Sequence, residues 1–253
     1  MKKNVIVVGL GEVGKPLAKL LSLYHNVTEV DLAPVTVSAG CVDVMHICYP
    51  FEIPHFVTVT SDYIEHYKPE LTVINSTIGI GTTRLIAERT RATVVHSPVR
   101  GKHAKMFDEI GSYTKFIGSI TPDGGRVAAE HFQSAGIKTR ILASPEATEL
   151  AKLTETTYFG LLIAWAQEVE RYCDATGQDY TDIISFYEEI KYLPQVKFFP
   201  GIIGGHCVMP NIKILKAFAS ALSLDLIEKS NKEKIKRENQ KVVSANMALS
   251  SCR

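Results

Sequence analysis

The sequence has little of what marks secreted, metal-binding or nucleic-acid-binding proteins. Its 253 residues contain five cysteines, an odd number without a CxxC pair, which predicts free thiols instead of a disulfide framework or a zinc site. The 28 Lys and Arg residues nearly balance the 27 Asp and Glu residues, so the chain has no broad basic field for nucleic acid. Its eight histidines are scattered, and we therefore expect no metal centre.

Long apolar runs are also missing. No stretch approaches the roughly 18 to 20 apolar residues of a membrane-spanning helix, and the run after Met1-Lys2-Lys3 is too short for a secretory signal. We therefore expect a cytoplasmic protein with no membrane partner. With 45% hydrophobic and 22% charged residues, the composition is that of a soluble protein, and its length fits two linked domains best.

The first part of the chain alternates between strand-like apolar runs and helical segments. The expected strands are Asn4–Val8, Asn26–Val30, Val42–Cys48, Leu71–Asn75, Thr93–His96, Lys115–Ile117 and Thr139–Leu142. Such alternation is typical of a parallel sheet covered by helices, two of which are expected near Leu17–Leu23 and Gly125–Ser134. The predicted fold class is therefore α/β, with a doubly wound parallel Rossmann sheet in residues 1–143. His46, inside one apolar run, is expected to be a hydrogen-bonded core histidine.

From Pro145 onward the apolar residues recur at intervals of three and four, which predicts an all-α domain over residues 144–253. The expected helices are Ala147 to about Gly177, Tyr180–Tyr192 and Asn211–Leu222, with a loop rich in proline and glycine at Pro194–Gly205. The tail Lys229–Lys241 is dense in lysine and glutamate, and we interpret it as a solvated helix instead of a binding surface.

A glycine-rich turn follows the first expected strand and opens the first helix. In this turn Gly9 permits the tight bend, Gly11 lets backbone N–H groups approach a diphosphate, and Gly14 allows the helix to pack closely on the strand. The amides of Gly11, Glu12 and Val13 would receive the diphosphate at the positive end of the helix dipole. A glycine pattern alone is weak, but its place between a strand and a helix makes it a specific sign of dinucleotide binding.

Asp31 ends the second expected strand, about 20 residues after the glycine turn. There its carboxylate can accept hydrogen bonds from the adenosine ribose hydroxyls and would repel a 2′-phosphate. Leu32, Ala33 and Pro34 provide no arginine for that phosphate, so we expect NAD and not NADP as the cofactor. The alternative is a purely structural turn with Asp31 as a surface acid.

Five segments carry a recognisable combination of motifs. They are GLGEVGKPLA (9–18), DVMHICYP (43–50), NSTIGIGTT (75–83), ELAKLTETTYFGLLIAWAQEVERYC (149–173) and PGIIGGHCVMPN (200–211). Together they resemble the UDP-glucose/GDP-mannose dehydrogenase family, within the wider 6-phosphogluconate dehydrogenase-like group. The last segment is the most specific, because Gly-Gly-His-Cys after a proline-glycine loop is unusual. The resemblance runs to about Asn231, and we expect the chain to lack the family's C-terminal domain, which helps to bind the nucleotide of the substrate.

The resemblance implies oxidation of a sugar or nucleotide-sugar alcohol by NAD in two steps, through a cysteine-bound thiohemiacetal and a thioester that water hydrolyses. It assigns the nucleophile to Cys207, stabilisation of the developing oxyanion to Lys152, and a place beside the reacting centre to Thr77. These roles suit the residue types, since a thiolate attacks carbonyls and an ammonium stabilises growing negative charge. As a lone cysteine, Cys207 could instead be a small buried hydrophobic residue.

Three positions depart from the family's pattern. Thr156 stands where the family has an asparagine four residues after its lysine, Val99 replaces the glutamate of a Ser-Pro-Glu segment, and Asn211 replaces an aspartate. Both carboxylates that could activate water are absent, and an amide cannot act as a general base. Thr156 and Asn211 remain candidate catalytic-site residues, but the second oxidation is left open.

Three functions therefore stay open. The first is an NAD-dependent dehydrogenase of the nucleotide-sugar type that acts on a smaller or differently held substrate. The second is a two-electron dehydrogenase resembling hydroxyacid dehydrogenases, in which Lys152 polarises the alcohol and Cys207 is a bystander. The third is a catalytically silent NAD-binding protein. We expect a homodimer, because the helical domain has more apolar surface than two helices can hide and the family dimerises through the helix after Asn231.

Overall fold

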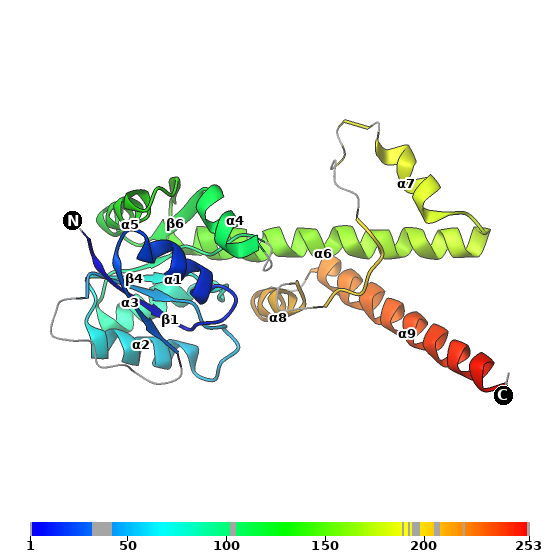
Figure 1. Cartoon of the computed structure of the whole chain (residues 1–253), viewed down its shortest axis with the longest axis horizontal. Coiled ribbons are helices and arrows are strands. Elements are labelled where there is room, and N and C mark those ends of the chain that lie inside the picture. Colours follow the sequence, from blue (N-terminus) through cyan, green and yellow to red (C-terminus); the bar gives the residue numbers. More distant parts are fainter. Residues whose placement is uncertain are drawn as a thin grey trace. The chain divides into compact units, whose positions relative to one another are not determined.

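The structure, a computed structural model, describes residues 2–31, 42–101, 105–188, 190–191, 193, 198–204, 208–219 and 221–251. Its contacts separate two compact units, Met1–Lys152 and Leu153–Arg253 (Figure 1). The sequence places the domain boundary between residues 143 and 144, whereas this division falls inside a long helix. That helix thus contributes residues to both units.

The first unit is built on a seven-stranded sheet with the strand order β2-β1-β3-β4-β5-β6-β7. Its strands are β1 (Asn4–Val8), β2 (Asn26–Val30), β3 (Val44–Ile47), β4 (Leu71–Ile74), β5 (Val94–His96), β6 (Lys115–Ser119) and β7 (Thr139–Leu142). The predicted α/β Rossmann fold is confirmed, but β5 and β6 pair antiparallel where we expected a fully parallel sheet. Because β6 starts at the edge of the sheet at which β5 ends, the segment between them does not have to cross the sheet.

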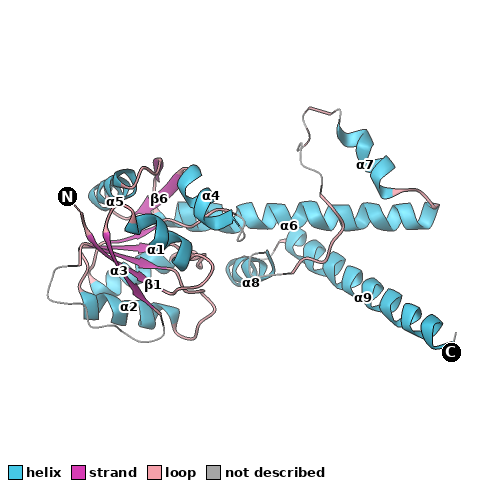
Figure 2. Ribbon diagram, viewed as in Figure 1, coloured by secondary structure: helices cyan, strands magenta, loops and turns pink. Residues whose placement is uncertain are grey.

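Helices cover both faces of this sheet (Figure 2). They are α1 (Gly14–Ser22), α2 (Phe56–Tyr67), α3 (Thr82–Thr90), α4 (Met106–Ser112) and α5 (Pro122–Ser134). Side chains of α1, α4 and α5 pack in one hydrophobic core, and those of α2 and α3 pack in another. Within β1, Val5 and Val7 belong to the first core, whereas Ile6 and Val8 belong to the second. The strand is apolar at successive positions because both of its faces are buried.

Two polar side chains, one in β3 and one directly after it, are buried in this unit. The Nε2 atom of His46 lies 2.9 Å from Nε2 of His131, and its Nδ1 atom lies 3.1 Å from Nδ2 of Asn75. The prediction that His46 is a hydrogen-bonded core histidine is therefore confirmed. Burial, followed by the nearby His131, holds its pKa well below the ordinary value, so the ring is neutral. Cys48 is a buried free thiol whose pKa burial raises to about 12.

The second unit is helical, as the spacing of its apolar residues predicts. Its helices are α6 (Pro145–Thr176), which begins in the first unit, α7 (Tyr180–Glu188), α8 (Val208–Phe218) and α9 (Leu222–Ser251). α8 begins at Val208 and not at Asn211. Pro210 fits in its first turn, because proline lacks an N–H group and the N–H groups of a first turn have no partner within the helix. α7 ends at Glu188, short of the predicted Tyr192, and turn hydrogen bonds follow it. None of the described helices is both long and apolar enough to span a bilayer.

A small hydrophobic core joins α6, α8 and α9. Ala164 of α6, Ile212 of α8 and Ile227 of α9 belong to it. At Gly160 the helices approach closely, since a Cβ atom there would lie 2.4 Å from Cγ1 of Val208. The glycine therefore sets the distance between α6 and the start of α8.

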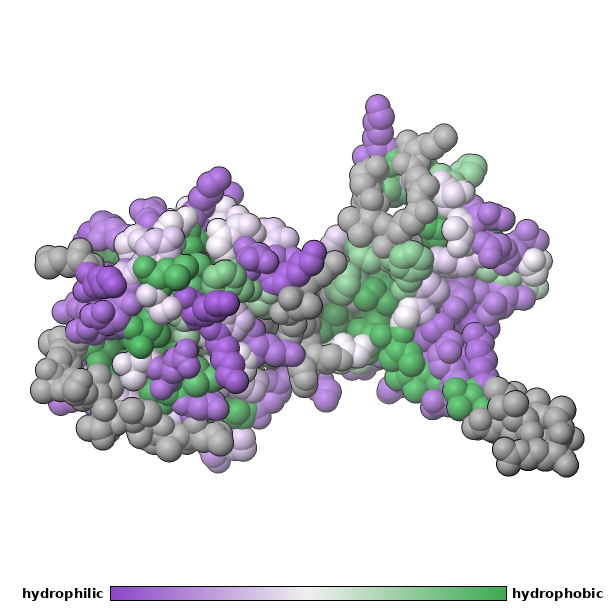
Figure 3. All heavy atoms as spheres, in the orientation of Figure 1, coloured by the Kyte–Doolittle hydropathy of each residue, from purple (hydrophilic) through white to green (hydrophobic). Residues whose placement is uncertain are grey.

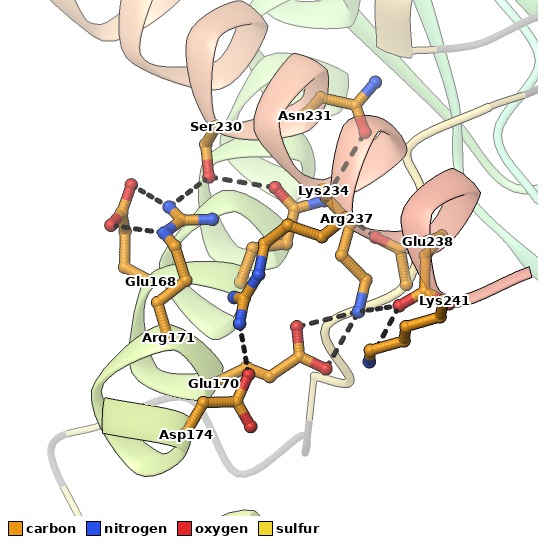
Figure 4. A network of polar contacts seen from close by, with 12 residues as sticks. Glu168, Glu170, Arg171, Asp174, Ser230, Asn231, Lys234, Arg237, Glu238 and Lys241 are labelled. Atoms are coloured by element: carbon orange, nitrogen blue, oxygen red, sulfur yellow. Dashed lines mark hydrogen bonds and ion pairs between the residues drawn. The ribbon is translucent and has the colours of Figure 1, made fainter. Parts of the chain in front are cut away.

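The charged tail of the second unit packs on α6 (Figure 4). Lys234 of α9 is buried, and its Nζ donates to the two carboxylate oxygens of Glu170 at 2.8 and 2.7 Å. Arg237 pairs with Asp174 about one turn further along. The interpretation of residues 229–241 as a solvated helix is thus wrong for this face of α9. Its basic side chains find carboxylate partners on α6, which composition alone does not reveal.

Candidate cofactor and catalytic site

Gly9 and Gly14 bring the end of β1 against the start of α1. Gly9 has a φ of 91°, in the left-handed region, and its N–H donates to Val30 O of β2 at 2.8 Å. A Cβ atom on Gly9 would lie 2.6 Å from Tyr49 N, and one on Gly14 would lie 1.8 Å from Gly9 O. Both positions therefore exclude any side chain.

Gly11 differs from these two glycines because its side of the turn faces open space. A Cβ atom there would meet no atom of the described chain within 4 Å. Val13, the N-cap of α1, makes no side-chain cap hydrogen bond, and no acidic residue occupies the first turn. The amides of Gly11, Glu12 and Val13 thus lie at a helix N-terminus without a side-chain cap, an arrangement suited to a phosphate.

Asp31 lies beside the same turn. Its Oδ1 atom accepts a hydrogen bond from Leu10 N at 3.2 Å, and the residue is exposed. In the sheet β1 stands between β2 and β3, so the strand order reverses direction at β1. Dinucleotides bind at such a switch point, outside the carboxyl ends of the strands, where the glycine turn and Asp31 are located. Leu32, Ala33 and Pro34 lie outside the described residues.

Thr77 lies in the loop that follows β4, next to the loop that follows β3. The Ser76 hydroxyl donates to Tyr49 O at 2.5 Å, and Tyr49 N is the atom that approaches Gly9. The Thr77 side chain is partly exposed. The structure thus brings Thr77 to the same edge of the sheet as the glycine turn.

Glu149, whose role the sequence did not reveal, anchors the start of α6 to the start of α3. Its buried carboxylate accepts hydrogen bonds from Gly81 N at 2.6 Å, Thr83 N at 2.9 Å and Thr83 Oγ1 at 2.6 Å. Burial raises the pKa of this carboxyl, and the three hydrogen bonds act against that rise. Because Gly81 is the N-cap of α3, the carboxylate also meets the positive end of the helix dipole.

Lys152 lies about one turn after Glu149 on α6. It is partly buried. Burial lowers the pKa of both His96 and Lys115, and the charge of Lys152 adds to the effect at each of them. Lys152 is therefore close to the end of β5 and the start of β6, and Glu149 fixes the helix that carries it.

His96, a second residue that the sequence did not single out, joins the end of β5 to α6 and to the loop of Thr77. Its Nε2 atom lies 3.1 Å from Ser76 O, and its Nδ1 atom lies 2.8 Å from Thr148 Oγ1. A carbonyl oxygen only accepts, so Nε2 carries the proton, and Nδ1 of the neutral ring accepts from the Thr148 hydroxyl. Burial lowers the pKa of this histidine to about 3, which keeps the ring neutral.

The positions of the two missing carboxylates are occupied by uncharged groups. Val99 is buried in the first hydrophobic core. Asn211 of α8 donates through Nδ2 to Thr156 Oγ1 of α6 at 2.7 Å, and both side chains are buried. The Thr156 hydroxyl in turn donates to Leu153 O at 3.1 Å. The structure thus brings Thr156 and Asn211 together as a neutral hydrogen-bonded pair.

The loop that leads toward Cys207 is held by two amide side chains. Asn231 of α9 accepts from Ile203 N at 2.7 Å and donates to Ile203 O at 2.9 Å, as a paired strand would. Gln167 of α6 donates to Gly201 O at 2.7 Å. Cys207 itself, the predicted nucleophile, lies outside the described residues.

Comparison with known proteins agrees with the family resemblance. Residues 146–235 match the family model for the central domain of the UDP-glucose/GDP-mannose dehydrogenase family. A UDP-N-acetyl-D-mannosamine dehydrogenase of Methanococcus maripaludis is 25% identical over 81% of this chain and 59% of its own length. The chain therefore spans about three fifths of that relative. The resemblance to this family is confirmed.

Solved structures show the same fold. The chain superposes on a UDP-D-ManNAc dehydrogenase of Pyrococcus horikoshii with a TM-score of 0.84 and 18% identity, covering 98% of this chain and 72% of that one. It also superposes on a 3-hydroxyisobutyrate dehydrogenase of Mycobacterium tuberculosis with a TM-score of 0.71 and 16% identity, covering 93% and 94%. Both likenesses concern the fold.

The substitution Glu149→Gln is expected to destabilise the first unit, because the NH2 group that replaces one carboxylate oxygen would face the N–H group of either Gly81 or Thr83. We expect the free energy of unfolding, measured by urea denaturation, to fall by about 1–3 kcal/mol. Glu146→Gln is the matched control. Glu146 pairs with Arg84 at the surface, and its loss should cost less than about 1 kcal/mol. Equal losses in the two variants would show that Glu149 does not anchor α3.

Proposed function

We propose that the protein is an NAD-dependent oxidoreductase that oxidises an alcohol group of a sugar or sugar-nucleotide-like substrate. The observation that supports this most is the glycine turn at the switch point of the sheet, with open space at Gly11 and Asp31 beside it. The match of residues 146–235 to the family's central domain adds independent support. The names of the matched relatives suggest the substrate class.

The described residues fit NAD at this turn. The open space beside Gly11 can admit the diphosphate, and the Asp31 carboxylate can accept hydrogen bonds from the adenosine ribose while repelling a 2′-phosphate. When bound, NAD supplies the acceptor for the hydride. We assign Thr77, at a nearby strand end, to a place beside the reacting centre.

We assign activation of the substrate alcohol to Lys152. An ammonium near the alcohol oxygen would stabilise the negative charge that develops there as the hydroxyl proton passes to water, and the hydride would then pass from the carbon to NAD. Cys207 would hold the aldehyde for a second oxidation. In the Thr156–Asn211 pair, neither side chain can accept a proton as a general base.

A second candidate function is a two-electron dehydrogenase like the hydroxyacid dehydrogenases. It is favoured by the buried Val99 and by the neutral Thr156–Asn211 pair, since neither position supplies a carboxylate to activate water. In this case Lys152 keeps its role and Cys207 is a bystander. A catalytically silent NAD-binding protein is the third possibility.

Binding of NADH at the glycine turn is tested by titration calorimetry. Gly11→Ala places a methyl group in the space proposed for the diphosphate and is expected to weaken NADH binding about tenfold or more. Gly111→Ala is the matched control. A Cβ atom at Gly111 also meets no described atom within 4 Å, but Gly111 lies in α4 and not in the glycine turn. Equal NADH affinities of the two variants would argue against the proposed site.

Substitutions of Lys152 and Cys207 separate the candidate functions. Lys152→Met is expected to lower kcat about 10²- to 10³-fold in either dehydrogenase, because the charge on the alcohol oxygen loses its partner. NADH formed per molecule of UDP-N-acetyl-D-mannosamine, or of a hydroxy acid, is counted spectrophotometrically. Two NADH in wild type and one in Cys207→Ser support four-electron chemistry. One NADH in both supports the two-electron reaction. NADH binding without turnover of any sugar or hydroxy acid points to the silent protein.

We propose that the protein forms a homodimer through its helical unit and acts in the cytoplasm. Large apolar side chains are exposed on α6 and α9, namely Tyr158, Phe159, Trp165, Tyr172, Leu226, Ile235, Val242 and Val243. Figure 3 shows hydrophobic residues on the surface of this unit. Burial of such a surface between two copies would remove it from water. The free thiols of Cys48 and Cys173 suit a reducing compartment.

Light scattering of the purified protein is expected to give the mass of two chains, because the exposed apolar side chains of α6 and α9 need a partner surface. The mass of one chain at micromolar concentration would contradict the dimer.

A further inference from the structure

Lys115, the first residue of β6, is a buried cation at the ends of two neighbouring strands. Its Nζ donates to Asn75 Oδ1 at 3.2 Å, Ser97 O at 2.6 Å and Pro98 O at 3.3 Å. Asn75 begins the loop that carries Thr77, and Ser97 and Pro98 begin the loop that follows β5. One amino group thus holds both loops together.

The hydrogen-bond partners of Lys115 require three donors. Asn75 Nδ2 donates to Val73 O at 3.2 Å, which fixes the other amide atom, Oδ1, as the acceptor that faces Lys115. The two carbonyl oxygens of Ser97 and Pro98 also only accept. An ammonium supplies three N–H groups, whereas a neutral amine supplies two and directs a lone pair at the third acceptor. The site is therefore complete only when Lys115 carries its proton.

The surroundings of Lys115 weaken its hold on that proton. The titratable and charged groups that face it are the neutral His46 and His96, the thiol of Cys48, and the cations Arg100 and Lys152. The ring of Phe132 lies 5.2 Å from Nζ. No carboxylate is among these groups in the part of the chain that the structure describes. Burial, followed by the charges of Lys152 and Arg100, lowers the pKa of Lys115 to about 7, although Cys48 acts in the opposite direction.

We propose that Lys115 is a positioning residue whose ammonium form ties the loop of Thr77 to the loop of Ser97 and Pro98, so that NADH binding and hydride transfer weaken as the pH rises through neutrality. This inference rests on the proposed function, in which Thr77 lies beside the cofactor. Lys115 acts through Asn75 and does not itself touch substrate or cofactor, since it is buried. Loss of its proton leaves one acceptor of the network unpaired and weakens the contact between the loops.

The test measures the dissociation constant of NADH by calorimetry between pH 6 and pH 8.5 for the full chain and for Lys115→Met. We expect wild type to bind NADH about tenfold more weakly at pH 8.5 than at pH 6, and Lys115→Met to bind weakly with no such change. Lys138→Met is the matched control. Lys138 is exposed beside β7, and its backbone oxygen accepts a hydrogen bond from Lys115 N. The variant lacks only the Lys138 side chain and should therefore keep the pH dependence of wild type.

The outcomes separate this inference from the function on which it rests. Failure of wild type to bind NADH at any pH would overturn both. NADH binding that does not change with pH in wild type, or that changes equally in wild type and Lys115→Met, would overturn the role of Lys115 alone. Should Lys115→Met not fold, Lys115→Gln, which retains two N–H groups without charge, takes its place with the same expected result.

Discussion

The close packing of α1 on β1 at Gly9 and Gly14 is the constraint on which the proposed function depends. A methyl group on Gly14 would overlap Gly9 O, and one on Gly9 would overlap the backbone of Tyr49. With both glycines in place, the helix starts shortly after the end of the strand, and in the turn between them the amide of Leu10 donates to Asp31. Tyr49 then links this turn to the next strand ends, through the hydroxyl of Ser76.

Buried polar contacts extend this arrangement along the edge of the sheet. Glu149 docks α6 on the N-terminus of α3, His96 joins β5 to α6, and Lys115 joins the loops after β4 and β5. Each contact satisfies groups that would be costly to bury without a partner. The contacts of Glu149 and His96 connect the helix that carries Lys152 with other elements of the first unit, and His96 also contacts Ser76, next to Thr77.

The sequence predicts the helices and strands, because these depend on the local pattern of apolar residues and glycines. It does not predict the contacts between residues that are far apart in the chain. The run of buried residues in β1 and the glycine turn leave clear local signals, as do the apolar intervals of α6. Glu149 and Lys115 look like ordinary charged residues until the segments that surround them are in place. Lys234 looks solvated by composition, yet it faces a carboxylate on α6. Thr156 and Asn211 are each predictable from the family's pattern, but their hydrogen bond depends on how α6 packs on α8.

The most direct measurement is a crystal structure of the protein with NADH. We expect electron density for the diphosphate against the amides of Gly11, Glu12 and Val13, and a ribose hydroxyl within hydrogen-bonding distance of Asp31. A dinucleotide bound at another place, or a turn whose open side is filled by the protein's own side chains, would contradict the proposed cofactor site and the oxidoreductase function with it.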